Sequence, residues 1–228
     1  MLIETRRLSK SYQRGKETVA ALRGVDLTID EGEFVTVMGP SGCGKSTLLH
    51  LLGGIDRPTS GQISVDGRDL ASMSEEELTR FRKENVGFVF QFYNLLPTLS
   101  ALENVELPLV AQRHPRRDRR QMARAALRAV GLDHRFDHKP GELSGGQQQR
   151  VAIARAMVAE PKLVLADEPT GDLDSESARV VVDLMKELNE RLGLTFVVVT
   201  HDPVVAEQGR RMIRLKDGEI AESDAGRV

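Results

Sequence analysis

Short apolar runs alternate along this chain with longer stretches of mixed character. The short runs are rich in β-branched residues and end at turn residues such as Gly and Asp, which is typical of strands. The run at 163–166 has no polar position, as expected for a central parallel strand with both faces covered. Strands are predicted at residues 2–12, 25–38, 61–67, 86–90, 163–166 and 195–200, with a final hairpin about 217–218.

The longer stretches carry apolar residues every three or four positions, the spacing of a helix with one buried face. Ser74 and Ser100 each stand three residues before a Glu, an arrangement that caps the start of a helix. Helices gathered between strands predict an α-helical insertion of roughly 65 residues in an α/β core. Helices are expected at 74–82, from 100 to about 157 with breaks near 115 and 131, and at 175–192 before Gly193.

One loop between a predicted strand and a predicted helix carries a phosphate-binding motif. Residues 39–47 fit the pattern G-x-x-x-x-G-K-[ST]. Its glycines let backbone N–H groups curl around a phosphate at a helix start, where the dipole is positive. Lys45 is expected to reach the β- and γ-phosphates, and the Ser46 hydroxyl to ligate Mg²⁺. The nucleotide-binding residues predicted here are Gly39, Ser41, Gly42, Cys43, Gly44, Lys45, Ser46 and Thr47.

Two carboxylates, Asp167 and Glu168, follow the apolar run at 163–166. Because that strand is expected beside the phosphate loop, Asp167 is predicted to hold Mg²⁺, directly or through water. Glu168 is predicted to orient or deprotonate an attacking water. The alternative is a strand-end pair that merely caps a neighbouring helix. The position of the strand favours the functional interpretation.

Composition narrows the class of protein. The chain has 228 residues, 40% hydrophobic content and a formal net charge of −2, which suits an α/β domain and gives no reason to expect nucleic acid as a partner. Its single cysteine excludes an intramolecular disulfide and fits a reducing compartment. The first residues lack the apolar core of a signal peptide, and no apolar run approaches the ~20 residues that span a bilayer. A cytoplasmic protein is expected.

Three features leave alternatives open. Tyr12 is either a surface residue or an aromatic that stacks on a nucleotide base. Cys43 lies within the expected anion nest and is hypothesised to be open to alkylation that ATP blocks. A basic cluster in the helical insertion favours a solvated helix face, with anionic lipid or a protein partner as the alternative. The cluster consists of Arg113, Arg116, Arg117, Arg119 and Arg120.

A Ser-Gly-Gly turn before a helix identifies a family. Residues Leu143 to Gln147 read Leu-Ser-Gly-Gly-Gln, with Gln149-Arg150 just behind, and this resembles the signature motif of ATP-binding-cassette (ABC) ATPases. Other pieces agree with that family in order and spacing over essentially the whole chain. They are Tyr12, the lid-loop Gln91, the loop Gly171-Asp172-Leu173-Asp174 and the switch His201.

The resemblance implies a fold and its division. The implied fold class is α/β, a phosphate-loop NTPase (RecA-like) core with an N-terminal antiparallel β-subdomain and an inserted α-helical subdomain. Residues 1–228 would form a single nucleotide-binding domain. The core would take residues 1–91 and 160–228, and the helical subdomain residues from about 92 to 159.

The resemblance also implies roles in ATP and Mg²⁺ binding. Tyr12 would stack on adenine, Gln91 would contact Mg²⁺ and water, and His201 would sense the γ-phosphate. Two such domains would sandwich two ATP molecules head to tail, so that the signature of one copy reaches the nucleotide held by Lys45 of the other. The residues expected to complete the nucleotide site in this way are Ser144, Gly145, Gly146, Gln147 and Asp174.

In the family, such a dimer drives a separate membrane permease, which implies a peripheral position on the cytoplasmic face of the inner membrane. The expected permease contact is the apolar cluster Phe92, Tyr93, Leu95 and Leu96 near Gln91. The alternative is that these residues pack the insertion onto the core.

The segments Asn94 to Pro97 and Glu103 to Pro108 resemble the lipoprotein-release and macrolide-exporter group. Asp172 departs from that group, which usually has Asn there. A cell-division or cell-wall regulatory ATPase is the alternative. A soluble DNA-repair or translation ATPase is disfavoured, because sustained heptads and a second cassette are absent from the sequence.

Overall fold

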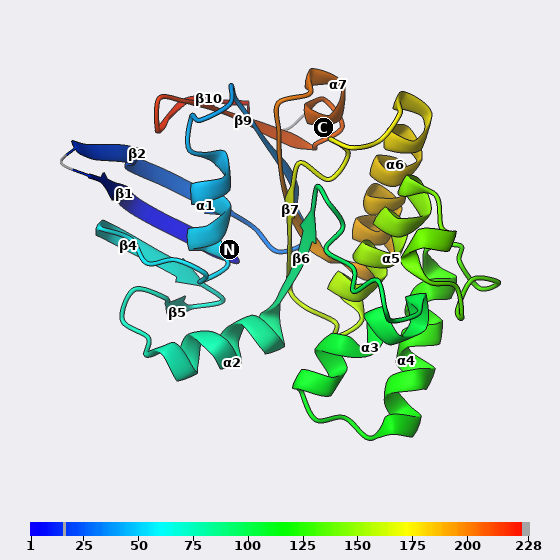
Figure 1. Cartoon of the computed structure of the whole chain (residues 1–228). Coiled ribbons are helices and arrows are strands. Elements are labelled where there is room, and N and C mark those ends of the chain that lie inside the picture. Colours follow the sequence, from blue (N-terminus) through cyan, green and yellow to red (C-terminus); the bar gives the residue numbers. More distant parts are fainter. Residues whose placement is uncertain (16, 225–228) are drawn as a thin grey trace.

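The computed structural model describes residues 1–15 and 17–224, and two β-sheets form its framework (Figure 1). The first sheet is antiparallel with the order β2-β1-β4-β5. Its strands are β1 (Ile3–Arg14), β2 (Glu17–Ile29), β4 (Ser60–Val65) and β5 (Arg68–Asp69). The second sheet has the order β10-β9-β3-β8-β7-β6 and is parallel except where β10 pairs with β9. Its strands are β3 (Phe34–Met38), β6 (Val86–Phe90), β7 (Leu163–Asp167), β8 (Thr195–Thr200), β9 (Arg211–Lys216) and β10 (Glu219–Asp224).

Helices cover both faces of the second sheet, and each face has its own hydrophobic core. On β8, Phe196 and Val198 belong to the core shared with the helical insertion, whereas Val197 and Val199 belong to the core shared with α1 and the first sheet. Successive side chains of a strand point to opposite faces, so one apolar run serves both cores. The helices are α1 (Lys45–Leu52), α2 (Glu75–Asn85), α3 (Ala101–Ala111), α4 (Arg116–Ala129), α5 (Gly145–Met157), α6 (Ser175–Leu192) and α7 (Pro203–Ala206), with a short 3₁₀ helix at Pro140–Glu142.

The predicted fold class, an α/β phosphate-loop core with an antiparallel β-subdomain and an inserted helical part, is confirmed by this architecture. Both predicted capping boxes are present, at Ser74 and at Ser100, and Gly193 ends α6 with a left-handed φ of 67°. The predicted strands and the final hairpin are also present. Within the described residues, no helix is long and apolar enough to cross a membrane.

Two boundaries differ from the prediction. β2 begins at Glu17, eight residues before the expected start, because its first part pairs with β1 while leaving most side chains exposed and therefore shows no apolar run. The predicted break near residue 131 is present, but the helix expected to resume directly after it is wrong, because up to residue 144 only the 3₁₀ helix forms. That segment caps α3, since the carbonyls of His138 and Phe136 accept hydrogen bonds from the N–H groups of Ala101 and Leu102.

Candidate functional site

The phosphate loop joins β3 to α1 and is shaped by glycines in left-handed conformations. Gly42 has a φ of 79° and Gly44, the residue before α1, a φ of 108°. At Gly44 a Cβ atom would lie 2.4 Å from the Ala21 carbonyl oxygen, so β2 presses directly on the loop. The sequence needs glycine here both for the backbone angle and for this close approach.

Lys45 is the first residue of α1, and its side chain is 7% exposed. Its Nζ donates hydrogen bonds to the carbonyl oxygens of Gly39 at 2.8 Å and Pro40 at 3.1 Å. It also lies 3.9 Å from Oε1 of Glu168. The ammonium group is therefore held over the loop, next to a carboxylate at the end of another strand, where it can meet a phosphate.

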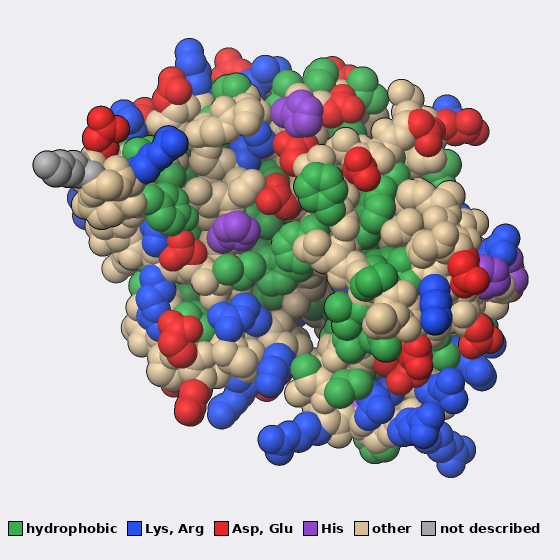
Figure 2. Space-filling view, viewed as in Figure 1, with side chains coloured by type: hydrophobic (Ala, Val, Ile, Leu, Met, Phe, Trp, Pro, Cys, Tyr) green, Lys and Arg blue, Asp and Glu red, His purple; other side chains and the backbone are tan. Residues whose placement is uncertain are grey.

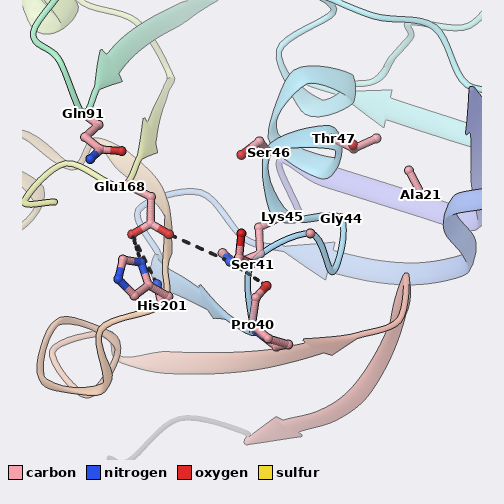
Figure 3. Close-up of a pocket in the computed structure, with 11 residues that line it drawn as sticks. Ala21, Pro40, Ser41, Gly44, Lys45, Ser46, Thr47, Gln91, Glu168 and His201 are labelled. Carbon is pink, nitrogen blue, oxygen red and sulfur yellow. Dashed lines mark hydrogen bonds and ion pairs between the residues drawn. The ribbon is translucent and has the colours of Figure 1, made fainter. Parts of the chain in front are cut away.

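A pocket of about 590 Å³ opens at this loop (Figure 3). It brings together residues from three strand ends and the phosphate loop. Nine of the predicted site residues line it, together with two residues that were not predicted. The lining residues are Ala21, Pro40, Ser41, Gly42, Gly44, Lys45, Ser46, Thr47, Gln91, Glu168 and His201.

The residues at the rim fit a magnesium ion. Ser46 Oγ donates a hydrogen bond of 3.1 Å to Oδ1 of Asp167, so a hydroxyl and a carboxylate oxygen stand side by side. Burial raises the pKa of Asp167, and the hydrogen bond from Ser46 partly offsets that effect. In the part of the chain that the structure describes, no group of three or more His, Cys, Asp or Glu could hold a metal. Mg²⁺ is commonly bound by one or two carboxylates together with substrate phosphates, which agrees with this donor set.

Glu168 and His201 form a contact across the pocket, each directly after a parallel strand. Oε2 of Glu168 accepts a hydrogen bond from the backbone N–H of His201 at 3.2 Å and lies 3.0 Å from its Nδ1. Glu168 has a φ of 46°, an unusual angle for a glutamate and one found disproportionately at functional sites. Figure 3 shows its carboxylate between the imidazole and Lys45. From these positions Glu168 can act as a base toward a water molecule, and His201 can contact a γ-phosphate.

Gln91 follows β6, and its position comes from the sheet register. Phe90 pairs with Asp167, so Gln91 and Glu168 follow neighbouring strand ends. Gly171 lies under the Gln91 side chain, since a Cβ at Gly171 would be 2.9 Å from Gln91 Nε2. The amide therefore lines the pocket beside the catalytic candidates, where a contact with a metal-bound water is possible.

Gln149 ties the helix α5 to both of these strand ends. Its side chain is completely buried, and Nε2 donates hydrogen bonds to the carbonyl oxygens of Phe90, at 3.3 Å, and Pro169. Those two residues stand directly before Gln91 and directly after Glu168. The sequence placed Gln149 only in the family motif and gave no sign of this bridge, because it joins segments that are far apart along the chain.

The predicted signature residues lie outside the pocket. Ser144 is the N-cap of α5 and forms a capping box with Gln147. Gly145 lies against Tyr93 and Leu173, and Gly146 against Ser177. Within one chain, then, the signature forms an exposed helix start, and the phosphate pocket is lined without it.

Two other predicted nucleotide ligands, Tyr12 and Asp174, have hydrogen-bond partners within the chain. Tyr12 is 39% exposed, does not line the pocket, and donates a hydrogen bond from its hydroxyl to Oδ2 of Asp56 at 2.8 Å. Asp174 is the N-cap of α6 and accepts from the N–H groups of Glu176 and Ser177; these bonds, with that of the Ser177 hydroxyl, lower its pKa. Their roles toward a nucleotide stay predictions.

Cys43 differs from the sequence-based expectation. Its side chain is 5% exposed and belongs to the core beneath α1, with Sγ packed at the site where a Cβ of Gly39 would fall. The hypothesis that this thiol is open to alkylation is therefore wrong for this conformation. Sequence reasoning also missed Ala21 and Pro40 as pocket residues. Ala21 lies in the early part of β2, and only a prediction that this part pairs with β1 could have placed Ala21 at the pocket.

A buried parallel sheet, a phosphate loop at its carboxyl edge and a hydroxyl–carboxylate pair beside a candidate base define a phosphate-loop nucleotide hydrolase. A family model described as "ABC transporter" matches residues 22–171. The chain belongs to the ABC transporter family, as its signature motif predicted, and it is an ATPase.

Relatives of known name are similar over nearly the whole chain. A lipoprotein-releasing system ATP-binding protein, LolD of Idiomarina loihiensis, is 50% identical over 95% of this chain and 95% of its own length. The macrolide export ATP-binding/permease protein MacB of Escherichia coli is 50% identical over all of this chain, which spans 35% of that longer protein. A dimeric post-hydrolysis structure of the ATP-binding cassette MJ0796, with ADP and Pi bound, superposes with a TM-score of 0.91 at 46% identity and covers both chains completely; MJ0796 comes from Methanocaldococcus jannaschii.

Proposed function

We propose that two copies of this chain bind two MgATP head to tail and use hydrolysis to drive a separate membrane permease. The observation that carries the proposal is the separation of two ATP-contacting motifs within one chain. The phosphate pocket lies in the core, while Ser144 and Gly146 stand at an exposed helix start that does not line it. A helix start with free N–H groups is an anion site. A second copy would bring that start to the γ-phosphate held by Lys45. The dimeric MJ0796 cassette supports this arrangement.

Each residue then has a chemical part in hydrolysis. Lys45 neutralises phosphate charge, while Ser46 and Asp167 would hold Mg²⁺, which would supply further positive charge for the phosphates. Glu168 orients a water and accepts its proton, and His201 contacts the γ-phosphate. Gln91, which directly follows β6, would also contact that Mg²⁺.

A groove of about 490 Å³ between α2 and the helical insertion is the place for the permease. It is lined mainly by apolar groups, among them Phe88, Phe90, Pro108, Ala111 and Ala156. An apolar groove of this size suits a short helix of a partner. Of the cluster predicted from the sequence, Phe92 and Leu96 are 69% and 47% exposed and remain free for such a contact.

The other two members of that cluster pack within the chain. Tyr93 is buried and Leu95 packs against the helical core. At the edge of the groove, Arg155 of α5 donates hydrogen bonds to the carbonyl oxygens of Tyr93 at 2.7 Å and Asn94 at 2.5 Å. These two residues have left-handed φ values of 58° and 50°. A permease segment in the groove would press on this turn and thereby on the signature helix.

The names of the relatives support a narrower proposal. The transported molecule is a lipoprotein, lipid, peptide or drug that is exported or extracted from the membrane. LolD is named for a lipoprotein-releasing system and MacB for macrolide export. The chain then works at the cytoplasmic face of the inner membrane as a peripheral subunit. Transport of such substrates by the reconstituted complex in vesicles separates this function from a purely regulatory one.

Purification of the tagged chain from detergent-solubilised membranes tests the proposal. An integral membrane protein is expected to copurify in stoichiometric amount and to stimulate ATP hydrolysis. Ala111→Arg, which fills an exposed position of the groove, is expected to lose that partner and retain basal ATPase activity. A copurifying partner that is unaffected by Ala111→Arg, or no membrane partner at all, would contradict the proposal.

A further inference from the structure

Positive charge is concentrated in one helix of an otherwise acidic chain. α4 contains six arginines, one aspartate and no lysine, which gives it a formal charge of +5. The whole chain has a formal charge of −2, so the remaining residues carry −7. Such a helix is a candidate for contact with an anionic surface.

The arginines of α4 fall into groups with different surroundings. Arg119 and Arg120 lie 3.8 and 3.6 Å from the carboxylate of Glu106, which offsets part of their charge. Arg124 and Arg128 extend over the ring of Phe136, with guanidinium carbons 5.7 and 6.0 Å from its centre. These four arginines therefore each have a partner within the chain.

Arg113, Arg116 and Arg117 have no such explanation, and we call these three residues the basic corner. All three are exposed, and none of them lies within 4.0 Å of a carboxylate among the residues that the structure describes. Arg113 occupies the α3–α4 turn with a left-handed φ of 63°, and the other two begin α4. All three residues lie at the same end of the helical insertion, and their exposed side chains are available for a ligand outside the chain.

The basic corner adjoins the groove proposed for the permease. Gln112 Nε2 donates a hydrogen bond of 2.5 Å to the carbonyl oxygen of Lys83, so the α3–α4 turn touches the end of α2. Lys83 and Ala111 both line the groove. In Figure 1, α2 and the α3–α4 turn form the lower edge of the molecule, and Figure 2 shows Lys and Arg side chains on both sides of the cleft there. A permease seated in the groove would turn this edge toward the bilayer.

We propose that the basic corner binds the headgroups of anionic phospholipids beside the permease. This inference rests on the proposed function, because a docked permease is what orients the edge. Guanidinium groups form paired hydrogen bonds with phosphate oxygens, which fits a corner built only from arginine. The cytoplasmic leaflet is negatively charged and attracts such clusters. The cytoplasmic loops of membrane proteins carry an excess of Lys and Arg, so a permease loop would repel the corner rather than attract it.

Flotation of the full chain with lipid vesicles tests the inference without permease or nucleotide. The chain is expected to float with vesicles of phosphatidylcholine mixed with phosphatidylglycerol, and to stay behind with vesicles of phosphatidylcholine alone. Raising the salt concentration should weaken the association. Because each arginine near an anionic surface contributes about fivefold, Arg116→Glu/Arg117→Glu should weaken binding at least about twentyfold.

A matched control reverses two charges at the opposite edge, in Arg214→Glu/Lys216→Glu on β9, and should float like the wild type. Arg116→Gln/Arg117→Gln, which adds no new charge, keeps the test valid should the glutamate variant fail to fold. The basal ATPase activity of the glutamine variant should equal that of the wild type, since neither residue lines the phosphate pocket.

Equal flotation of the wild type and the glutamine variant would overturn the inference, as would equal flotation with both kinds of vesicle. Poly-L-glutamate offered at the same charge concentration separates a lipid from an acidic protein surface. Binding of that polymer through the same arginines as tightly as the vesicles would assign the corner to a protein. The two tests are independent. A chain that does not float with vesicles would still be an ATPase subunit of a permease, and a chain that copurifies with no permease could still float.

Discussion

The buried amide of Gln149 gives the sharpest test of how the signature helix is joined to the ATP site. Its Nε2 donates to the carbonyl oxygens of Phe90 and Pro169 and thereby holds α5 against the segments that carry Gln91 and Glu168. Gln149→Met keeps the volume of the side chain and removes both donors. The change therefore isolates the hydrogen bonds from packing.

The structure sets the size of the effect. A buried neutral hydrogen bond contributes about 1 kcal/mol, and leaving a buried carbonyl without a partner costs about 1–3 kcal/mol. The Phe90 carbonyl keeps a second donor, the N–H of Tyr93 at 3.3 Å, so the larger loss falls on Pro169. Gln149 Oε1 has no partner in the described structure, and its removal gives back part of the cost. The free energy of unfolding should fall by about 2 kcal/mol, which lowers Tm by roughly 4–8 °C in a domain of this size.

Thermal unfolding without nucleotide, followed by circular dichroism, measures the stability. The ATPase rate measures the second consequence, a fall in kcat as Gln91 and Glu168 lose their common support. Gln148→Met is the matched control, because Gln148 is the preceding residue of the same helix, is only partly buried and donates a single side-chain hydrogen bond, to the carbonyl oxygen of Leu143. If the two variants unfold at the same temperature with the same kcat, the bridge by Gln149 has no energetic weight and the reasoning is refuted.

Three further changes probe other parts of the account. Gly87→Ala should destabilise the fold by about 3 kcal/mol in urea unfolding, because the new Cβ would meet the backbone oxygen of Ala156 at 2.2 Å; an unchanged midpoint would show that α5 and β6 can separate. Lys45→Met should abolish ATP binding in equilibrium titration, and retained affinity would mean that another residue holds the phosphates. Burial raises the pKa of Asp56, but hydrogen bonds from Lys10 and other groups outweigh burial and lower the pKa overall. The ionised carboxylate therefore stabilises the fold above pH ~4, and this stabilisation is lost as the pH falls. The unfolding free energy of Asp56→Asn should approach that of the wild type toward pH ~3, and a difference that stays constant with pH would contradict this.

Much of the site could be predicted from the sequence because its residues stand at the ends of elements that local patterns define. Glu168 and His201 each follow a buried apolar run, and the strands pair in parallel, which brings their carboxyl ends to one edge. The phosphate loop needs only its own glycines and the helix behind it. Here local pattern and global fold agree.

The parts that could not be predicted depend on contacts between distant segments. The segment 130–144 lies in a stretch that was predicted to be mainly helical, yet two of its carbonyls accept hydrogen bonds from the first turn of α3. Ala21 reaches the pocket because the first part of β2 pairs with β1. The side chains of that part are mostly exposed, so the sequence shows no apolar pattern that would predict the pairing. The burial of Cys43 follows from the way α1 packs on the sheet, and the phosphate motif alone says nothing of where that side chain points.

The central claim is that each ATP site is complete only when two copies of this chain come together around the nucleotide. Glu168→Gln removes the proposed base and leaves the phosphate loop intact, so ATP should be bound and hardly hydrolysed. Light scattering on the eluting protein measures its mass directly. With MgATP the variant should elute at twice the 25.2 kDa of the chain, and without nucleotide, or with Ser144→Arg added, as a monomer. A Glu168→Gln variant that stays monomeric with MgATP, or that hydrolyses ATP at the normal rate, would contradict the account.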